Sequence, residues 1–264
     1  MIGAIAGDII GSVHEGAGTK TRDFPLFHDA CRFTDDSVLT VATAACLLDD
    51  GDFTDYYHDY FQAWPDAGFG GNFFHWAAAR DRQPYYSYGN GAAMRVSPVG
   101  FAGVTLEAVL DQAQRSAAVS HDHPEGIRGA QATAAAIFLA RQGEGKAAMR
   151  ARIEELFGYD LGRRLADIRP LYRFDVSCQG SVPESIIAFL EADDYESTIR
   201  NAISLGGDAD TMACIAGGIA EAWYGGVPAA IRGPALDRLD PRLRAVVERF
   251  VEHHDVPGLE SGAR

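Results

Sequence analysis

Positively charged residues are few in this chain of 264 residues, with 23 lysines and arginines against 37 aspartates and glutamates. The formal net charge of −14 works against binding to nucleic-acid backbones and to anionic lipid surfaces, because like charges repel. We therefore expect no general nucleic-acid partner and no membrane partner. The same charge leaves room for a local set of carboxylates that bind metal cations.

Cysteine is also scarce, and no C-x-x-C pair joins Cys31, Cys46, Cys178 and Cys214. This spacing excludes a dense disulfide framework and a structural zinc site. No apolar run approaches the roughly 18 residues that cross a bilayer. Residues 1–8 lack the basic start of a signal peptide and reach an acid at Asp8. We therefore expect reduced, mostly buried thiols in a cytoplasmic protein.

Strand patterns are sparse, whereas helical patterns recur along the chain. No internal repeat or linker divides the sequence. Pro183 and Pro241 stand where the first turn of a helix tolerates proline. These features predict a single all-α domain over residues 1–264 with a loose tail at 256–264. The predicted helices are 38–48, 55–64, 127–141, 146–157, 183–190, 195–205, 211–224 and 241–253.

Glycine, in contrast, is abundant, with 29 copies. Gly3, Gly7 and Gly11 are four residues apart and would line one face of a helix, which predicts close packing against another helix. Other glycines occur in groups beside polar residues, as at 89 and 91 and at 206 and 207. Such loops are typical of segments that approach a ligand closely.

Two segments place a pair of aspartates and a threonine at the start of an apolar helix. They are Thr34-Asp35-Asp36-Ser37 and Asp208-Ala209-Asp210-Thr211. N-capping explains one such residue at each helix, but four buried carboxylates brought together would repel one another without a counter-charge. Two hard cations with oxygen ligands, roughly 3.5–4 Å apart, would remove this repulsion. The spacing indicates a binuclear Mg²⁺-type site if the two segments meet, which the sequence alone does not show.

Several common enzyme motifs are absent. The chain has no G-x-x-x-x-G-K-[ST], no G-x-G-x-x-G, no G-x-S-x-G and no H-E-x-x-H. Missing Glu-x-x-His pairs also disfavour a di-iron four-helix bundle.

Five blocks of sequence, in this order, resemble the motifs of the ADP-ribosylglycohydrolase family. That family includes the dinitrogenase-reductase-activating glycohydrolases and the vertebrate ADP-ribosyl-acceptor hydrolases. The blocks are Gly3-Ala-Ile-Ala-Gly7-Asp8-Ile-Ile-Gly11-Ser12 followed by Glu15, Thr34-Asp35-Asp36-Ser37, Tyr88-Gly89-Asn90-Gly91-Ala92-Ala93-Met94-Arg95, His121-Asp122-His123-Pro124, and Leu205-Gly206-Gly207-Asp208-Ala209-Asp210-Thr211 with the helix that follows it.

The resemblance implies a compact orthogonal multi-helix bundle with a centre of two Mg²⁺ ions, or Mn²⁺ in their place. It also implies an enzyme that hydrolyses the bond between the anomeric carbon of the distal ribose and an acceptor. Its partner would be an ADP-ribosylated protein or a small ADP-ribosyl conjugate, and we expect a monomer. The implied metal ligands are Thr34, Asp35, Asp36, Asp208, Asp210 and Thr211.

The resemblance also assigns catalytic candidates. Glu15, Asp36 and Asp208, with Asp210 as a further candidate, would take the proton of the attacking water or assist the leaving group. Glu15 lies among glycines suited to a mobile flap, so a gating residue and a solvated loop acid are its alternatives.

Substrate binding is expected at Tyr88, Gly89, Asn90, Gly91 and His123. Backbone N–H groups of residues 89–91 would approach the diphosphate. Tyr88 would stack on adenine, with an ordinary core or surface tyrosine as the alternative, and His123 would hydrogen-bond the diphosphate or the distal ribose. We expect the next arginine, at position 95, to place this loop through a salt bridge, and the aromatic–glycine stretch 64–73 to line the rim.

The acceptor stays open among arginine, serine, an ADP-ribosylated nucleic acid and an O-acetyl group. Two other classes of function remain as alternatives. A non-catalytic ADP-ribose-binding module would have lost a metal carboxylate or Glu15, and neither is lost here. A metal-dependent phosphohydrolase would release AMP from ADP-ribose, but no motif supports it.

Overall fold

Helices make up the regular structure of this protein. The computed structural model describes residues 1–256, and in these residues no β-strand occurs, only an isolated bridge between Gly89 and Ser177. The all-α prediction is therefore confirmed for the described residues. The helices are α1 (Ile2–Gly11), α2 (Asp35–Leu48), α3 (Phe53–Ala63), α4 (Gly71–Ala78), α5 (Gly91–Met94), α6 (Ser97–Ala102), α7 (Leu106–Ala118), α8 (Pro124–Arg141), α9 (Lys146–Phe157), α10 (Leu165–Ile168), α11 (Cys178–Leu190), α12 (Tyr195–Ile203), α13 (Ala209–Tyr224), α14 (Ala229–Leu236) and α15 (Pro241–His253).

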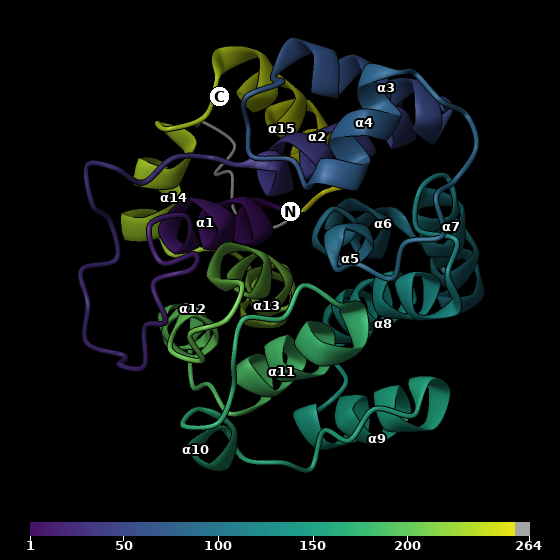
Figure 1. Cartoon of the computed structure of the whole chain (residues 1–264). Helices are drawn as coiled ribbons and strands as arrows, with labels where there is room; N and C mark the ends of the chain where they lie inside the picture. Colours follow the sequence, from purple (N-terminus) through teal and green to yellow (C-terminus); the bar gives the residue numbers. More distant parts are fainter. Residues whose placement is uncertain (257–264) are drawn as a thin grey trace, which may run out of the picture.

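α1 and α13 lie side by side in the middle of the molecule, and the other helices surround them (Figure 1). α1 is buried along its whole length, and its glycines let the two backbones touch. A Cβ atom at Gly3 would collide with the carbonyl oxygen of Gly217, and one at Gly7 with that of Ala213. The predicted packing role of these glycines is confirmed. As a result, Asp8 of α1 lies beside the first turn of α13.

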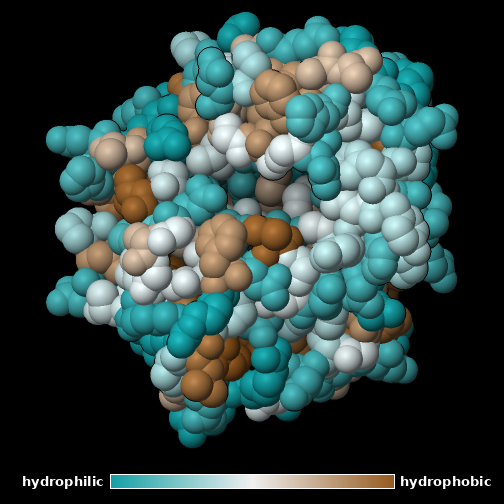
Figure 2. All heavy atoms as spheres, in the orientation of Figure 1, coloured by the Kyte–Doolittle hydropathy of each residue, from teal (hydrophilic) through white to brown (hydrophobic). Residues whose placement is uncertain are grey.

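The remaining helices pack around this pair. α2 contacts α1, α3, α6 and α15, while α8 contacts α6, α7, α11 and α13 (Figure 1). Apolar side chains from these helices form the hydrophobic core. The face shown in Figure 2 is mainly hydrophilic, carries separate hydrophobic patches and is hollowed near its centre. No helix in the described part of the chain is both long and apolar enough to span a bilayer.

The predicted helices all occur, but several begin earlier than their apolar patterns indicate. α9 and α15 have the predicted bounds. α2 begins at Asp35, because the side chain of Thr34 caps it. Ser177 caps α11 in the same way, so Pro183 lies inside this helix, and its predicted place in a first turn is wrong. The hydrogen bond that proline cannot donate is lost there, while packing against α8 and α13 holds the helix.

Six further helices are absent from the predicted set. Five of them are short, with four to eight residues, whereas α7 has 13 residues, a cap at Thr105 and the buried positions Val109 and Ala113, so its sequence does carry a helical signal. Helices of one or two turns are unstable alone and depend on tertiary packing, which a local pattern does not record. These helices are α4, α5, α6, α7, α10 and α14.

The end of the described chain differs from the predicted tail. Val256 is buried and its N–H donates to the carbonyl of Val251, so this residue packs back against the end of α15, which stops at His253. The other residues of the predicted tail, 257–264, lie outside the described residues. The prediction of free, mostly buried cysteines is confirmed, because all four are buried and none forms a disulfide.

Candidate metal and substrate site

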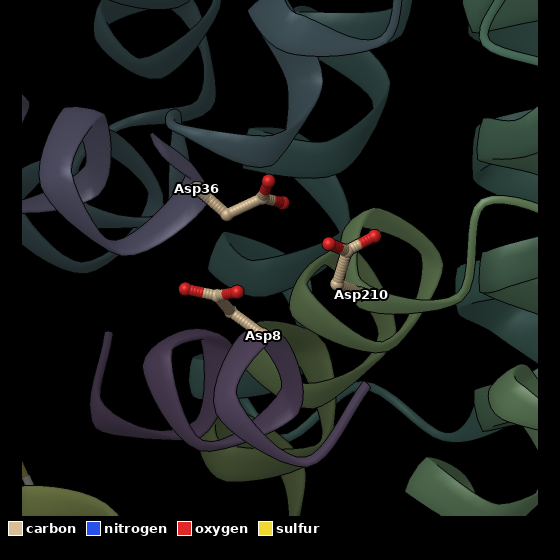
Figure 3. Close-up of side chains that lie close together, drawn as sticks. All are labelled: Asp8, Asp36 and Asp210. Atoms are coloured by element: carbon tan, nitrogen blue, oxygen red, sulfur yellow. The ribbon is translucent and has the colours of Figure 1, made fainter. Parts of the chain in front are cut away.

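Three buried aspartates from distant parts of the sequence point toward one another (Figure 3). Asp8 comes from α1, Asp36 from the first turn of α2 and Asp210 from the first turn of α13, and their carboxylate oxygens lie within 4.8 Å of one another. Glu15, Asp208 and Asp210 form a second group by the same distance. The two predicted aspartate segments therefore meet, and Asp210 belongs to both groups.

These carboxylates lie where negative charge is unfavourable. Burial, followed by repulsion from neighbouring acids, raises the pKa of Asp36 and of Asp210 well above the usual range. The same two causes raise the pKa of Asp35 to about 8. Oδ1 of Asp36 is buried and has no hydrogen-bond partner in the described residues. A divalent cation held by carboxylate oxygens would relieve the repulsion and supply that partner, so these residues fit the predicted metal centre.

Asp8 differs from the other acids because its oxygens are already occupied. They accept hydrogen bonds from the backbone N–H groups of Thr34 and Ser37, each at 3.0 Å, and from the hydroxyl groups of both residues. Burial still raises the pKa of Asp8 to about 6. Asp8 therefore holds the first turn of α2 in place. Sequence reasoning misses it as a site residue, although a lone acid in an apolar helix is an indication of such a role.

All six predicted metal ligands line one cavity of about 310 Å³. The hydroxyl of Thr34 lies 3.3 Å from Oδ2 of Asp36, and the hydroxyl of Thr211 lies 3.4 Å from the same atom. Asn90 donates from Nδ2 to Oδ2 of Asp208 at 2.8 Å and thereby orients this carboxylate. The ligands lining the cavity are Thr34, Asp35, Asp36, Asp208, Asp210 and Thr211.

Glu15 lies at the exposed edge of this cavity. Partial burial, and then the negative charge of Asp208, raises its pKa. Gly16 and Gly18 follow it with φ angles of +67° and +66°, which glycine adopts without strain. Beyond these glycines the segment is anchored, because Nζ of Lys20 donates to the backbone carbonyl of Tyr172, after α10, and to that of Leu205, before α13. Glu15 is thus carried by a short turn between fixed ends.

The loop of residues 89–91 also lines the cavity. The N–H of Gly89 donates to the hydroxyl of Ser87 at 3.1 Å, and the N–H of Asn90 donates to the carbonyl of Val176 at 2.8 Å. The N–H of Gly91 has no acceptor in the described residues. Of the three backbone donors predicted for the diphosphate, one is therefore free for a ligand.

Tyr88 and His123 lie outside the cavity lining. Tyr88 is 52% exposed, and its ring meets the edge of the His123 ring at a centroid distance of 5.4 Å. Nδ1 of His123 accepts the N–H of Glu125 and caps α8. Tyr85 and His121 line the cavity instead. Sequence reasoning misses both, although His121 belongs to the same quoted block as His123.

Arg95 lines the cavity but forms no ion pair in the described residues, so the expected salt bridge is wrong. Its side chain is fully buried, and its guanidinium carbon lies 4.1 Å from the centre of the Tyr57 ring. Nη2 donates to the carbonyl of Ser116 at 2.8 Å and to the hydroxyl of Ser120 at 2.9 Å. Arg95 thus fastens the end of α5 to the end of α7.

The aromatic–glycine stretch 64–73 contributes one side of the cavity. Gly68 and residues 70–73 line it, and the ring of Phe73 stacks on that of Phe69 at a centroid distance of 5.3 Å. Trp64 is turned elsewhere, because its indole donates to Asp240 at 3.3 Å. Only part of the stretch 64–73 therefore lines the cavity, although we expected the whole of it to do so.

Comparisons with known proteins agree on one family. The model of the ADP-ribosylglycohydrolase family matches residues 1–260. The ADP-ribosylhydrolase ARH3 of Mus musculus is 28% identical over 305 residues, which cover 85% of this chain and 82% of the relative. ARH3 of Homo sapiens is 27% identical over 306 residues, with 85% and 84% covered. A solved structure described as an ADP-ribosylglycohydrolase-related protein complex matches with a TM-score of 0.67 at 25% identity, covering 96% of this chain and 97% of the other.

Proposed function

This chain belongs to the ADP-ribosylglycohydrolase family and is an ADP-ribosyl hydrolase, and we propose that it frees ADP-ribose from an acceptor by cleaving the bond at the anomeric carbon of the distal ribose. The observation that carries this proposal is the meeting of Asp36, Asp208 and Asp210 with Glu15 at one cavity. We also propose that the enzyme works in the cytoplasm as a monomer.

We propose two Mg²⁺ ions as the cofactor, with Mn²⁺ as the alternative, since both prefer oxygen ligands. Asp36, Asp208 and Asp210 would hold them together with Asp35 and the hydroxyl groups of the two threonines at positions 34 and 211. The unpartnered oxygen of Asp36 and the sharing of Asp210 between two groups support two ions over one. When bound, the ions supply fixed positive charge beside the ribose hydroxyls and the attacking water.

The carboxylates of the chain would perform the proton transfers. Departure of the acceptor gives the anomeric carbon oxocarbenium character, and a water then needs to lose a proton as it attacks. Glu15 is the proposed general base, because it lies beside Asp208 at the open edge and its pKa is raised toward the working range. Asp36 and Asp208 are the other candidates for assisting this step.

The diphosphate and adenosine would extend from the carboxylates along residues 89–91. The free N–H of Gly91 is the proposed backbone donor to the diphosphate. Tyr88 and His123 are proposed to contact the outer part of the substrate, since their rings pack together beside this loop, with Tyr88 exposed and His123 half-buried.

Release of free ADP-ribose is the direct test. Purified protein would be mixed with arginine- and serine-linked ADP-ribosyl peptides, with ADP-ribosylated nucleic acid and with O-acetyl-ADP-ribose, each with Mg²⁺ or with chelator. We expect ADP-ribose from at least one substrate, only with the metal, and loss of this activity in Asp208→Asn. Asp111→Asn, at an exposed position on α7, is the matched control and should keep full activity.

Other outcomes would contradict the proposal. No ADP-ribose from any substrate, together with tight binding of ADP-ribose, would identify a binding module. AMP as the product would identify a phosphohydrolase. Release that neither the chelator nor Asp208→Asn affects would exclude the proposed metal centre.

A further inference from the structure

Lys20 joins two neighbouring turns at the edge of the cavity. We call residues 13–20 the Glu15 turn and residues 205–208 the Asp208 turn. Nζ of Lys20, at the end of the first, donates to the carbonyl oxygen of Leu205, at the start of the second. No other hydrogen bond between the two turns occurs in the described residues. This side chain is therefore their one hydrogen-bonded connection in that part of the chain.

The backbones of the two turns also touch. Gly206 has a φ angle of +66°, and a Cβ atom there would lie 2.8 Å from the carbonyl oxygen of Thr19 and 3.0 Å from Cε of Lys20. Glycine adopts this angle and permits this approach without strain. Within the Glu15 turn, Nδ1 of His14 lies 3.0 Å from Oγ1 of Thr19, which closes the turn across Glu15. A shift at Lys20 would therefore also shift Glu15.

The Asp208 turn has a further support that the Glu15 turn lacks. Nδ2 of Asn90 donates to Oδ2 of Asp208 at 2.8 Å, from the opposite wall of the cavity. Beyond Lys20, the next fixed point is the carbonyl of Arg22, which accepts from Arg200 of α12 at 2.9 Å and has no hydrogen bond to the Asp208 turn. Loss of Lys20 would thus release the Glu15 turn and leave Asp208 in place.

The ammonium group of Lys20 lies where other positive charges oppose it. Burial, and then the charges of Arg173 and Arg169, lowers its pKa. A lysine at the surface has a flexible stem and is free to turn into solvent, away from such neighbours. Here Nζ also donates to the carbonyl of Tyr172 at 2.8 Å. The backbone carbonyls, and not the surrounding charges, therefore hold Lys20 against the Asp208 turn.

We propose that Lys20 is a positioning residue that keeps the carboxylate of Glu15 beside Asp208, where it serves as the general base. This inference rests on the proposed function, because that function gives Glu15 this role. Oxygens of the two carboxylates lie within 4.8 Å of each other. Displacement of a catalytic group lowers the rate of the chemical step, while the contacts that bind ADP-ribose along residues 89–91 stay unchanged.

Lys20→Met tests the proposal, because it keeps a side chain of similar length and removes the donor. We expect kcat with the best substrate to fall about tenfold, while KM and the affinities for Mg²⁺ and free ADP-ribose stay within about twofold. Lys20→Arg keeps a cationic donor and should recover most of the rate. Lys146→Met is the matched control, because the other lysine of this chain also donates to two carbonyls, those of Phe189 and Ala192, and does not line the cavity.

A double substitution tests whether Lys20 acts through Glu15. In a Glu15→Gln background, Lys20→Met should cause no further fall in kcat, because the base that Lys20 positions is already absent. A second fall of similar size would show that Lys20 acts in another way and would overturn the inference.

The remaining outcomes separate this inference from the proposed function. An unchanged kcat in Lys20→Met overturns the inference alone, and so does an equal fall in Lys146→Met or a loss of Mg²⁺ affinity as large as the loss of kcat. If Glu15→Gln leaves kcat unchanged, the inference fails while metal-dependent release of ADP-ribose stands. Wild-type protein that releases no ADP-ribose from any substrate overturns the proposed function and this inference together.

Discussion

At the scale of single residues, the site depends on a contrast between two buried aspartates. Asp8 accepts hydrogen bonds from the backbone and hydroxyl groups of Thr34 and Ser37, so its charge is compensated by the protein. Asp36 keeps one buried oxygen without any partner in the described residues. A buried polar atom without a partner is costly. Asp36 is therefore the residue whose surroundings most favour a bound cation.

Asp36→Asn should abolish Mg²⁺ binding and lower the rate of hydrolysis by about 100-fold or more, since a ligand is lost. It should also make the metal-free protein more stable near pH 7, by roughly 1–4 kcal/mol, because an amide needs no proton to be buried beside other acids. Calorimetry with Mg²⁺ and thermal unfolding in chelator measure these effects. A variant that binds Mg²⁺ as tightly as the wild type would contradict the assignment of Asp36 as a ligand.

Glu15→Gln should lower kcat by roughly 10²–10⁴-fold, the usual contribution of a general base, while the affinity for free ADP-ribose changes little. Steady-state kinetics with the best substrate and calorimetry with the product separate the two effects. If kcat and KM both change modestly, Glu15 acts as a gate. An unchanged kcat would leave it as a solvated loop acid.

At the scale of helices, the contact between α1 and α13 decides whether the acids meet. Glycines on α1 let its backbone touch that of α13, and this contact sets Asp8 beside Asp210. The apolar patterns of α2 and α13 predict these helices, but no pattern within either helix predicts their distance. The short helices α4 and α5, which line the cavity, have no predictive pattern because packing alone stabilises them.

Gly7→Ala should force α1 and α13 apart, because its Cβ would collide with the carbonyl of Ala213. We expect destabilisation by roughly 1–3 kcal/mol, as for other overpacked cores, and weaker Mg²⁺ binding. Gly233→Ala in α14 is the control, since a Cβ there meets nothing within 4 Å. Urea unfolding and Mg²⁺ calorimetry are the measurements. Equal effects of the two substitutions would refute the role of close packing.

At the scale of the whole molecule, the net charge of −14 is unevenly distributed. Several acids lie in the interior around one cavity, where burial raises their pKa values. The stability of the protein should therefore depend jointly on pH and on the metal.

The pH dependence follows from the raised pKa values. Asp35 has a pKa of about 8 in the folded protein against 3.8 as its ordinary value, and Asp8 has one of about 6. The folded state binds these protons more tightly, so their stabilising contribution is full below pH 4 and is lost as the pH rises to about 8.

In chelator, we therefore expect the Tm to fall between pH 6 and pH 8, whereas saturating Mg²⁺ should remove most of this fall, because cations bind the ionised carboxylates. Thermal unfolding across this range measures the difference. Asp35→Asn should reduce the pH dependence in chelator. A Tm that is independent of pH in chelator would contradict the burial of these acids in the metal-free protein.

The sequence by itself determined the helical class, the family motifs and the six proposed metal ligands. These features depend on residue types and short spacings, which local patterns record. The resemblance also pointed to Glu15 and to residues 89–91, and all of them line the cavity.

Only the tertiary structure decided which polar groups are satisfied by the protein and which remain free for a ligand. Asp8 and Asp36 are both acids beside apolar residues, yet one is saturated by hydrogen bonds and the other is not. His121 and His123 belong to one motif, yet His121 lines the cavity while His123 caps a helix. The physical reason is that each outcome depends on partners far away in the sequence, such as Thr34 for Asp8 and Tyr85 for His121, which only the packed helices bring into contact.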